Sequence, residues 1–84
     1  MDKVAILAVV VNQNTQENVD QLNRLLHDFR SIIIGRMGLP YPERNLSLIS
    51  LMVDGKEDDI NALSGKLGMI PHVHVKTAYA NTNA

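Results

Sequence analysis

Apolar residues along this chain follow two kinds of spacing, which predict strands and helices in alternation. The run Val4–Val11 is continuous, short and rich in β-branched residues, which is typical of a strand buried on both faces. From Thr15 to Phe29 or Arg30 the apolar residues recur at a helical period, with polar residues between them. The apolar face of this predicted amphipathic helix carries Val19, Leu22, Leu26 and Phe29.

The middle of the chain predicts two further strands separated by a loop. Ser31–Met37 contains an Ile-Ile-Ile run, and branching at Cβ favours a strand there. Gly38–Asn45 contains a Pro-Tyr-Pro sequence that cannot lie inside a strand ladder, so this stretch is predicted to be a loop. Leu46–Val53 is predicted to be the next strand, and Asp54–Gly55 is expected to turn the chain.

Both predicted helices carry signals at their starts. Asn14 can accept hydrogen bonds from first-turn amides, and Glu17 three residues later completes a capping-box-like pattern. Asp58 or Asp59 is placed to cap a second helix and to complement the positive end of its dipole. The apolar stripe of this second helix contains Ile60, Leu63 and Leu67.

Glycine and proline mark the last third of the chain. Gly65 inside the second helix costs about 1 kcal/mol relative to alanine, which predicts close approach of another backbone. Gly68 is expected to end the helix. Pro71 is expected to open the last strand, His72–Tyr79.

The order of predicted elements is strand, helix, strand, strand, helix, strand. This order predicts an α+β, ferredoxin-like βαββαβ sandwich, in which a four-stranded antiparallel sheet carries two helices on one face. In that topology the first and third strands are central. We therefore expect one domain over residues 1–79 and a flexible tail over residues 80–84.

The two predicted central strands are apolar on both faces, whereas the uncovered face of a two-layer sandwich normally alternates to polar residues. An uncovered apolar patch predicts a partner surface, and the simplest partner is a second copy in a two-fold symmetric contact. We therefore expect a dimer or tetramer formed through the sheet face. The alternative is that long Lys and Arg stems, or the tail, shield the patch.

The composition limits the classes of protein to which this chain can belong. The chain has 84 residues, a formal net charge of −1, 4% aromatic residues and no cysteine. The lack of cysteine excludes disulfides, iron–sulfur clusters and thiolate zinc sites. The balanced charge argues against direct DNA binding by the domain alone. No apolar run approaches the roughly 20 residues of a membrane span, so we expect a cytoplasmic protein without membrane contact.

Two histidines are candidate metal ligands. His72 and His74 are expected on the same face of the last strand, because residues i and i+2 point together. Such a pair can bind nickel, copper or zinc when His27 or a symmetry-related copy supplies a third ligand. The alternative is a solvent-facing pair on an edge strand. The residues imply no cofactor firmly, and a transition metal is the candidate that stays open.

Four other side chains are candidate contacts for an effector or a partner. Arg36, Tyr41 and Arg44 flank the Pro-rich stretch and can recognise an anion or a protein. Lys66 belongs to a Ser-Gly-Lys sequence, but the strand and the long Gly-rich loop of a phosphate-binding motif are absent. Solvated side chains are the simpler interpretation. No nucleophile, base and orienting acid occur in a recognisable pattern, so no enzyme activity is predicted.

Two stretches of the chain, Gly35–Tyr41 (GRMGLPY) and Ile60–Lys76 (INALSGKLGMIPHVHVK), resemble the iron-only hydrogenase system regulator family. The likeness extends over nearly the whole chain, and its most specific parts are the Leu-Ser-Gly-Lys-Leu-Gly run and the Val-x-Val-Lys ending. That family is ferredoxin-like and similar to ACT-type regulatory domains, including the effector-binding domain of the nickel-responsive repressor. The resemblance implies transcriptional or assembly control of an iron-only hydrogenase system.

The sequence therefore predicts a small non-enzymatic regulatory module that works as an oligomer and senses an effector or binds a partner. The alternative is a structural interaction module without a small-molecule effector. A DNA-reading ribbon-helix-helix or helix-turn-helix would need residues that the sandwich already uses. The nickel site of the resembling repressor domains is not carried over, because it uses a cysteine that this chain lacks.

Overall fold

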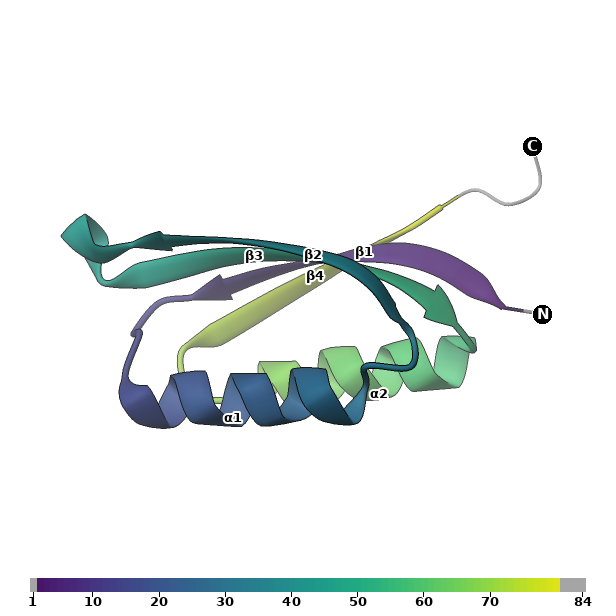
Figure 1. Ribbon diagram of the computed structural model, residues 1–84, viewed down its shortest axis with the longest axis horizontal. Helices are drawn as coiled ribbons and strands as arrows, with labels where there is room; N and C mark the ends of the chain where they lie inside the picture. Colours follow the sequence, from purple (N-terminus) through teal and green to yellow (C-terminus); the bar gives the residue numbers. More distant parts are fainter. Residues whose placement is uncertain (1, 81–84) are drawn as a thin grey trace.

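The computed structural model describes residues 2–80, which fold into two layers. Figure 1 shows a curved sheet above two helices that lie on the same side of it. No helix within residues 2–80 is long and apolar enough to cross a membrane. The elements in chain order are β1 (Lys3–Val11), α1 (Gln16–Asp28), β2 (Ile33–Tyr41), the short 3-10 helix η1 (Pro42–Arg44), β3 (Leu46–Gly55), α2 (Glu57–Gly68) and β4 (Val73–Tyr79).

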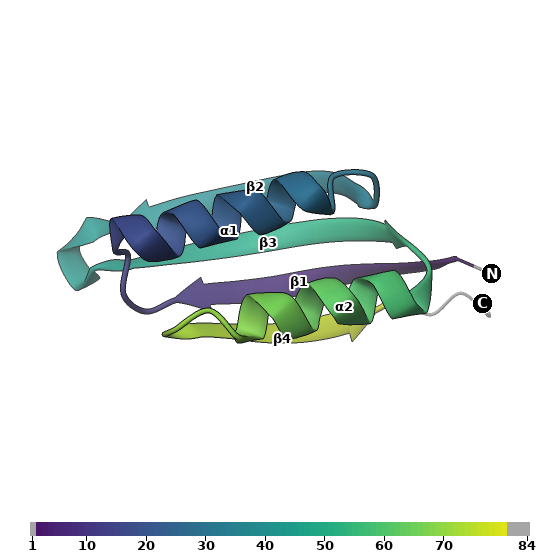
Figure 2. The same cartoon turned by 90° about the horizontal axis from the view of Figure 1, so that it is seen from below.

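The sheet confirms the predicted topology. The strand order is β2-β3-β1-β4, and every neighbouring pair is antiparallel, so β1 and β3 are central. Figure 2, which views the molecule from the helix side, shows α1 in front of β2 and β3 and α2 in front of β1 and β4. Both helices therefore cover one face of the sheet, and no other element within residues 2–80 covers the opposite face. This is the ferredoxin-like βαββαβ arrangement.

The core forms between the helices and one set of alternating strand residues. Successive side chains of a strand point to opposite faces, so every second residue of β1 is buried while its neighbours are not. The predicted apolar stripes of both helices face this layer. The buried core includes Ala5, Leu7, Val9 and Val11 of β1, Leu22 and Leu26 of α1, Leu51 and Val53 of β3, and Ile60, Leu63 and Leu67 of α2.

The predicted loop over Gly38–Asn45 is wrong in its first half. β2 continues through Pro40 to Tyr41, and Pro40 pairs with Ser47 of β3. β2 is an edge strand, and an edge strand accepts proline because only one of its sides belongs to a ladder. The turn predicted at Asp54–Gly55 is also wrong, since both residues still pair with β1.

The predicted helix starts need correction. Thr15, not Asn14, is the N-cap of α1, and its hydroxyl accepts from the Asn18 amide at 3.2 Å. The side chains of Asp58 and Asp59 do not cap α2, whose N-cap is Lys56 without a side-chain hydrogen bond. Both carboxylates lie in the first turn, where they complement the helix dipole as predicted.

Asn18 joins two loops at one end of the sandwich. Its side-chain amide is buried and donates to the Gln13 carbonyl at 2.9 Å and to the Pro71 carbonyl at 3.0 Å. The neighbouring His72 carbonyl accepts from Asn12 N–H at 2.8 Å. The β1–α1 and α2–β4 connections are therefore held together. Of the tail predicted over 80–84, residues 81–84 lie outside the described residues, and Ala80 donates its N–H to Val4.

Gly65 does not have the close neighbour that its position predicted. A Cβ at Gly65 would have no neighbouring atom within 4 Å, so the predicted backbone approach is wrong. We expect Gly65→Ala to raise the free energy of unfolding by about 0.5–1 kcal/mol, because alanine has less freedom to lose in a helix. Thermal unfolding of both proteins at one concentration measures the change. A lower melting temperature for the variant would contradict this interpretation.

Gly55 supplies the matched control for that measurement. A Cβ there would lie 2.7 Å from Cγ2 of the buried Ile32, which is closer than real contacts allow. Gly55→Ala is therefore expected to lower the melting temperature, although it is the same substitution.

Candidate functional site

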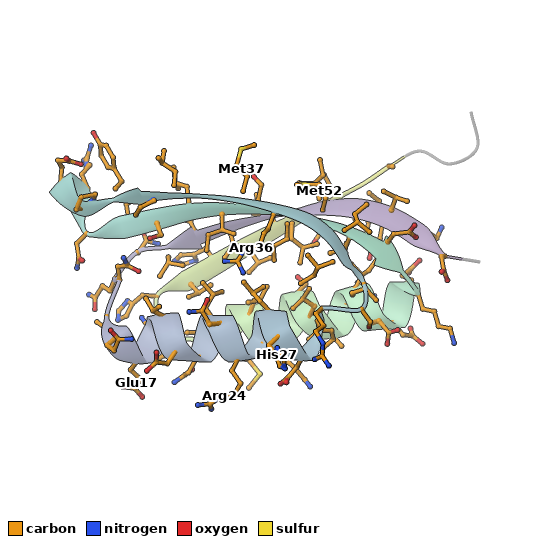
Figure 3. All side chains as sticks on the ribbon, in the orientation of Figure 1. Glu17, Arg24, His27, Arg36, Met37 and Met52 are labelled. Carbon is orange, nitrogen blue, oxygen red and sulfur yellow. The ribbon has the colours of Figure 1, made fainter. Side chains whose placement is uncertain are left out.

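The sheet face opposite the helices is lined mostly by apolar side chains, and we name it the open face. Met37 is 73% exposed, Ile34 65%, Leu39 58% and Ile6 49%, although all are large apolar residues. Figure 3 shows Met37 and Met52 projecting from this face, away from the helices. The open face comprises Val4, Ile6, Ala8 and Val10 of β1, Ile34, Met37, Leu39 and Tyr41 of β2, Leu46, Leu48, Ser50 and Met52 of β3, and His74, Lys76 and Ala78 of β4.

The strand register places the side chains of the open face in rows that run across the four strands, and large and small side chains alternate among them. The small residues Ala8 and Ser50 leave a hollow of about 240 Å³ beside Leu39 and Leu48. A second apolar hollow of about 330 Å³ is lined in part by Ile6. The relief can therefore receive side chains of another surface. The rows are Leu39, Leu48, Val10 and His74; then Met37, Ser50, Ala8 and Lys76; then Ile34, Met52, Ile6 and Ala78.

A cleft between α1 and β2 gathers basic side chains, and we name it the basic cleft. Its volume is about 350 Å³. Arg30 donates from Nη1 to the His27 carbonyl at 2.9 Å, and the same nitrogen lies 3.2 Å from His27 Nε2. Arg36 extends from β2 toward α1 (Figure 3). Among residues 2–80, the lining of this cleft contains no carboxylate: it is Asn23, Leu26, His27, Arg30, Ile33 and Arg36.

A groove of about 440 Å³ runs between the two helices. Lys66 and Arg24 contribute to its lining. The Lys66 ammonium lies 5.4 Å from the centre of the Phe29 ring, within range of a cation–π contact. This contact gives Lys66 a packing role between α2 and the end of α1.

The predicted contact residues occupy separate places. Arg36 lines the basic cleft, and Lys66 lines the groove between the helices. Tyr41 ends β2 on the open face, and Arg44 lies in η1, at the tip of the sheet in Figure 1. The structure thus assigns Arg36, Tyr41 and Lys66 to three different surfaces.

The histidine pair stays a prediction without further support within one chain. Within residues 2–80, no three His, Cys, Asp or Glu residues are grouped so that they could hold a metal ion. His72 precedes β4 and has a positive φ of 65°, so it does not share the regular strand spacing of His74. His27 lies at the basic cleft on α1. A metal at His72 and His74 would need its other ligands from elsewhere.

Sequence reasoning missed two residues of the basic cleft, Asn23 and Arg30, and assigned His27 only to a metal. The three residues recur at i, i+4 and i+7, the spacing of one side of a helix, and Arg30 lies just after the end of α1. This polar stripe is the signal that could have been found. Its partner, Arg36, comes from another element, so only the fold brings the set together.

The comparisons with known proteins name the family. The TM1266-like family, described as "Iron-only hydrogenase system regulator, putative", matches residues 3–77. The chain belongs to this family. The resemblance seen in Gly35–Tyr41 and Ile60–Lys76 is therefore confirmed. No curated protein sequence matches this TM1266-like chain.

Solved structures agree with the family and the fold. The uncharacterized protein TM1266 from Thermotoga maritima is 40% identical, with a TM-score of 0.93 over 96% of this chain and 100% of that one. The ACT domain from GTP pyrophosphokinase of Chlorobium tepidum is 19% identical, with a TM-score of 0.77 over 93% of this chain and 100% of that one. The latter likeness shows that the TM1266-like chain has an ACT-like fold.

Membership in a regulator family with this fold points away from an enzyme. Some proteins that contain the fold are enzymes, however. A formyltetrahydrofolate deformylase from Pseudomonas putida KT2440 matches 89% of this chain with 28% of its own, at 12% identity and a TM-score of 0.63.

Proposed function

We propose that this TM1266-like chain is a non-enzymatic, cytoplasmic regulatory module of an iron-only hydrogenase system. It self-associates through the open face and senses a small effector, which changes its binding to a partner. The family supports the regulatory role, and the open face is the observation that carries self-association. A contiguous apolar surface of this kind is rare on monomers and marks an interaction site.

The size of the open face suits a pair of copies. β1 and β3 contain 9 and 10 residues. At about 3.3 Å per residue and 4.8 Å between strands, the face is about 30 Å long and about 19 Å wide. Side-chain relief raises the accessible area above this flat projection, toward the ~800 Å² per partner of a standard interface. Two copies packed face to face would cover the apolar rows of both.

The strand β2 offers a physical link between an effector and the interface. Arg36 points into the basic cleft, while its neighbour Met37 lies on the open face. A ligand that fixes Arg36 therefore also restrains the strand that carries Met37. If the cleft differs between the separated and the associated chains, the ligand shifts the balance by its differential affinity for the two states.

A second function uses the same surface for a different partner. In this alternative the open face docks on a protein of the hydrogenase system, and the chain needs no effector. Thermal unfolding separates the two functions, because a small molecule that binds only the folded state must raise the melting temperature. A rise with a metal, nucleotide or amino acid favours the sensing function. A specific captured protein without any such rise favours docking.

Deletion of the gene in the source organism tests the proposed function. We expect changed levels of iron-only hydrogenase transcript or of hydrogen production in the deletion strain. The wild-type gene and a Met69→Glu gene should restore them, because Met69 is exposed at the end of α2, away from the open face. A Met37→Glu gene should not. Unchanged transcript and unchanged hydrogen production in the deletion strain would contradict the proposal.

A further inference from the structure

We propose that the basic cleft binds a small molecule through a single oxyanion, a phosphate or a carboxylate, held between Arg30 and Arg36. The lining of the cleft indicates the chemical class of the effector. Only the regulatory role of this binding rests on the proposed function. Binding itself depends on the side chains of one chain.

The two arginines are positioned by different elements. The backbone of Arg36 is held by the pairing of β2 with β3, where it stands opposite Leu51 just after an irregularity in the register. Arg30 follows the end of α1 and is anchored by the bond from Nη1 to the His27 carbonyl. A guanidinium has five N–H donors, so Nε and Nη2 of Arg30 stay available for a ligand. Pre-positioned donors lose less freedom when a ligand binds.

The chemistry of the lining favours a negative ligand. A guanidinium presents parallel N–H donors that match both oxygens of a carboxylate or phosphate. The lining that the described residues form contains two such groups and no carboxylate to neutralise them. The apolar Leu26 and Ile33 line the same cleft and can contact a less polar part of the ligand. Asn23 adds an amide donor.

Helix capping does not account for this cluster. The end of α1 attracts positive charge, and Arg30 meets that need through the His27 carbonyl. Arg36 belongs to the sheet, and nonetheless lines the same cleft as Arg30. Two guanidinium groups that line one cleft repel each other, and an anion bound between them would turn this repulsion into attraction. Their convergence is therefore the feature that points to a ligand.

The cleft continues into a second hollow, which suggests the shape of the ligand. This hollow has a volume of about 270 Å³ and shares Asn23 and Arg36 with the basic cleft. Its lining adds apolar side chains of the helix-facing side, including Val19, Leu22 and Pro40. The best ligand therefore carries its oxyanion between the arginines and a short, less polar part toward Pro40.

Titration calorimetry of the full chain at low ionic strength tests the site. The probes are inorganic phosphate and acetate, so that the two sources of an oxyanion are measured separately. We expect binding of at least one probe, and a loss of affinity of about tenfold or more in Arg36→Gln and in Arg30→Gln. Arg24→Gln is the matched control, because Arg24 lies on α1 outside the basic cleft. It should stay within about twofold of wild type.

The outcomes separate this inference from the proposed function. No heat with either probe, or an equal loss in all three arginine variants, would overturn the site even if the chain self-associates. Binding retained in a monomeric Met37→Glu variant and lost in Arg36→Gln supports a site within one chain. Circular dichroism checks that each variant is folded. Arg36→Lys keeps the positive charge but loses the parallel N–H donors of the guanidinium. Weaker binding by this variant therefore supports recognition of two oxygens of the ligand by Arg36.

Discussion

Glutamate in place of Met37 is expected to convert the proposed assembly of this chain into a 9.3 kDa monomer. Met37 is 73% exposed in the single chain and stands in the middle row of the open face. In a face-to-face pair this side chain would be covered, and a carboxylate there would lose its water without gaining a partner. We expect the dissociation constant to rise at least about a hundredfold.

Light scattering coupled to size-exclusion chromatography measures the mass at several concentrations. Met69→Glu is the matched control, since it makes the same chemical change at a residue that is 83% exposed but belongs to the helix layer. The control should keep the wild-type mass. Equal masses for the two variants at every concentration would contradict the assignment of the interface to the open face.

Alanine in place of Leu63 is expected to lower the free energy of unfolding by about 2–5 kcal/mol. Leu63 lies on the inner stripe of α2 and has no exposed surface. Its removal loses the hydrophobic transfer term and leaves a cavity that the surrounding core fills only in part. For a chain of this length, each kcal/mol corresponds to about 4–8 °C, so the melting temperature should fall by more than about 8 °C.

Denaturant and thermal unfolding at a fixed protein concentration measure this effect, because the proposed self-association would make the melting temperature depend on concentration. Gly65→Ala, two positions along the same helix on its exposed side, serves as the comparison and should shift stability upward. A loss below about 1 kcal/mol for Leu63→Ala would show that the core does not close around α2 as described.

The fold could be predicted because the apolar residues on the buried side of each strand or helix recur at the period of that element. The alternating core residues of β1 and the stripe of Ile60, Leu63 and Leu67 follow directly from which side of each element faces the core. The second apolar set on β1 and β3 predicted an uncovered face. These residues lie on the open face, where Ile6 and Leu48 are half exposed.

Local rules failed where tertiary position overrides them. Pro40 breaks an interior strand but is accepted in β2, which lies at the edge of the sheet. Gly65 was predicted to lie against another backbone, yet it faces solvent. Glycine occurs in helices for more than one reason, so its presence alone does not predict a close neighbour.

The candidate site was the least predictable part. Arg36 was identified from its own chemistry, but its neighbours were not. Arg30 and Asn23 look like ordinary solvated residues of an amphipathic helix, and their meaning depends on which strand lies beside α1. Proximity of that kind is set by the order of strands in the sheet and leaves no local pattern in the sequence.

Methionine oxidation of the purified wild-type chain tests the central claim most directly. In a single chain Met37 and Met69 have similar exposure, 73% and 83%, so dilute peroxide should oxidise them at similar rates. If a second copy covers the open face, Met37 should react many times more slowly than Met69, and dilution should remove the difference. Equal rates at every protein concentration would contradict self-association through this face.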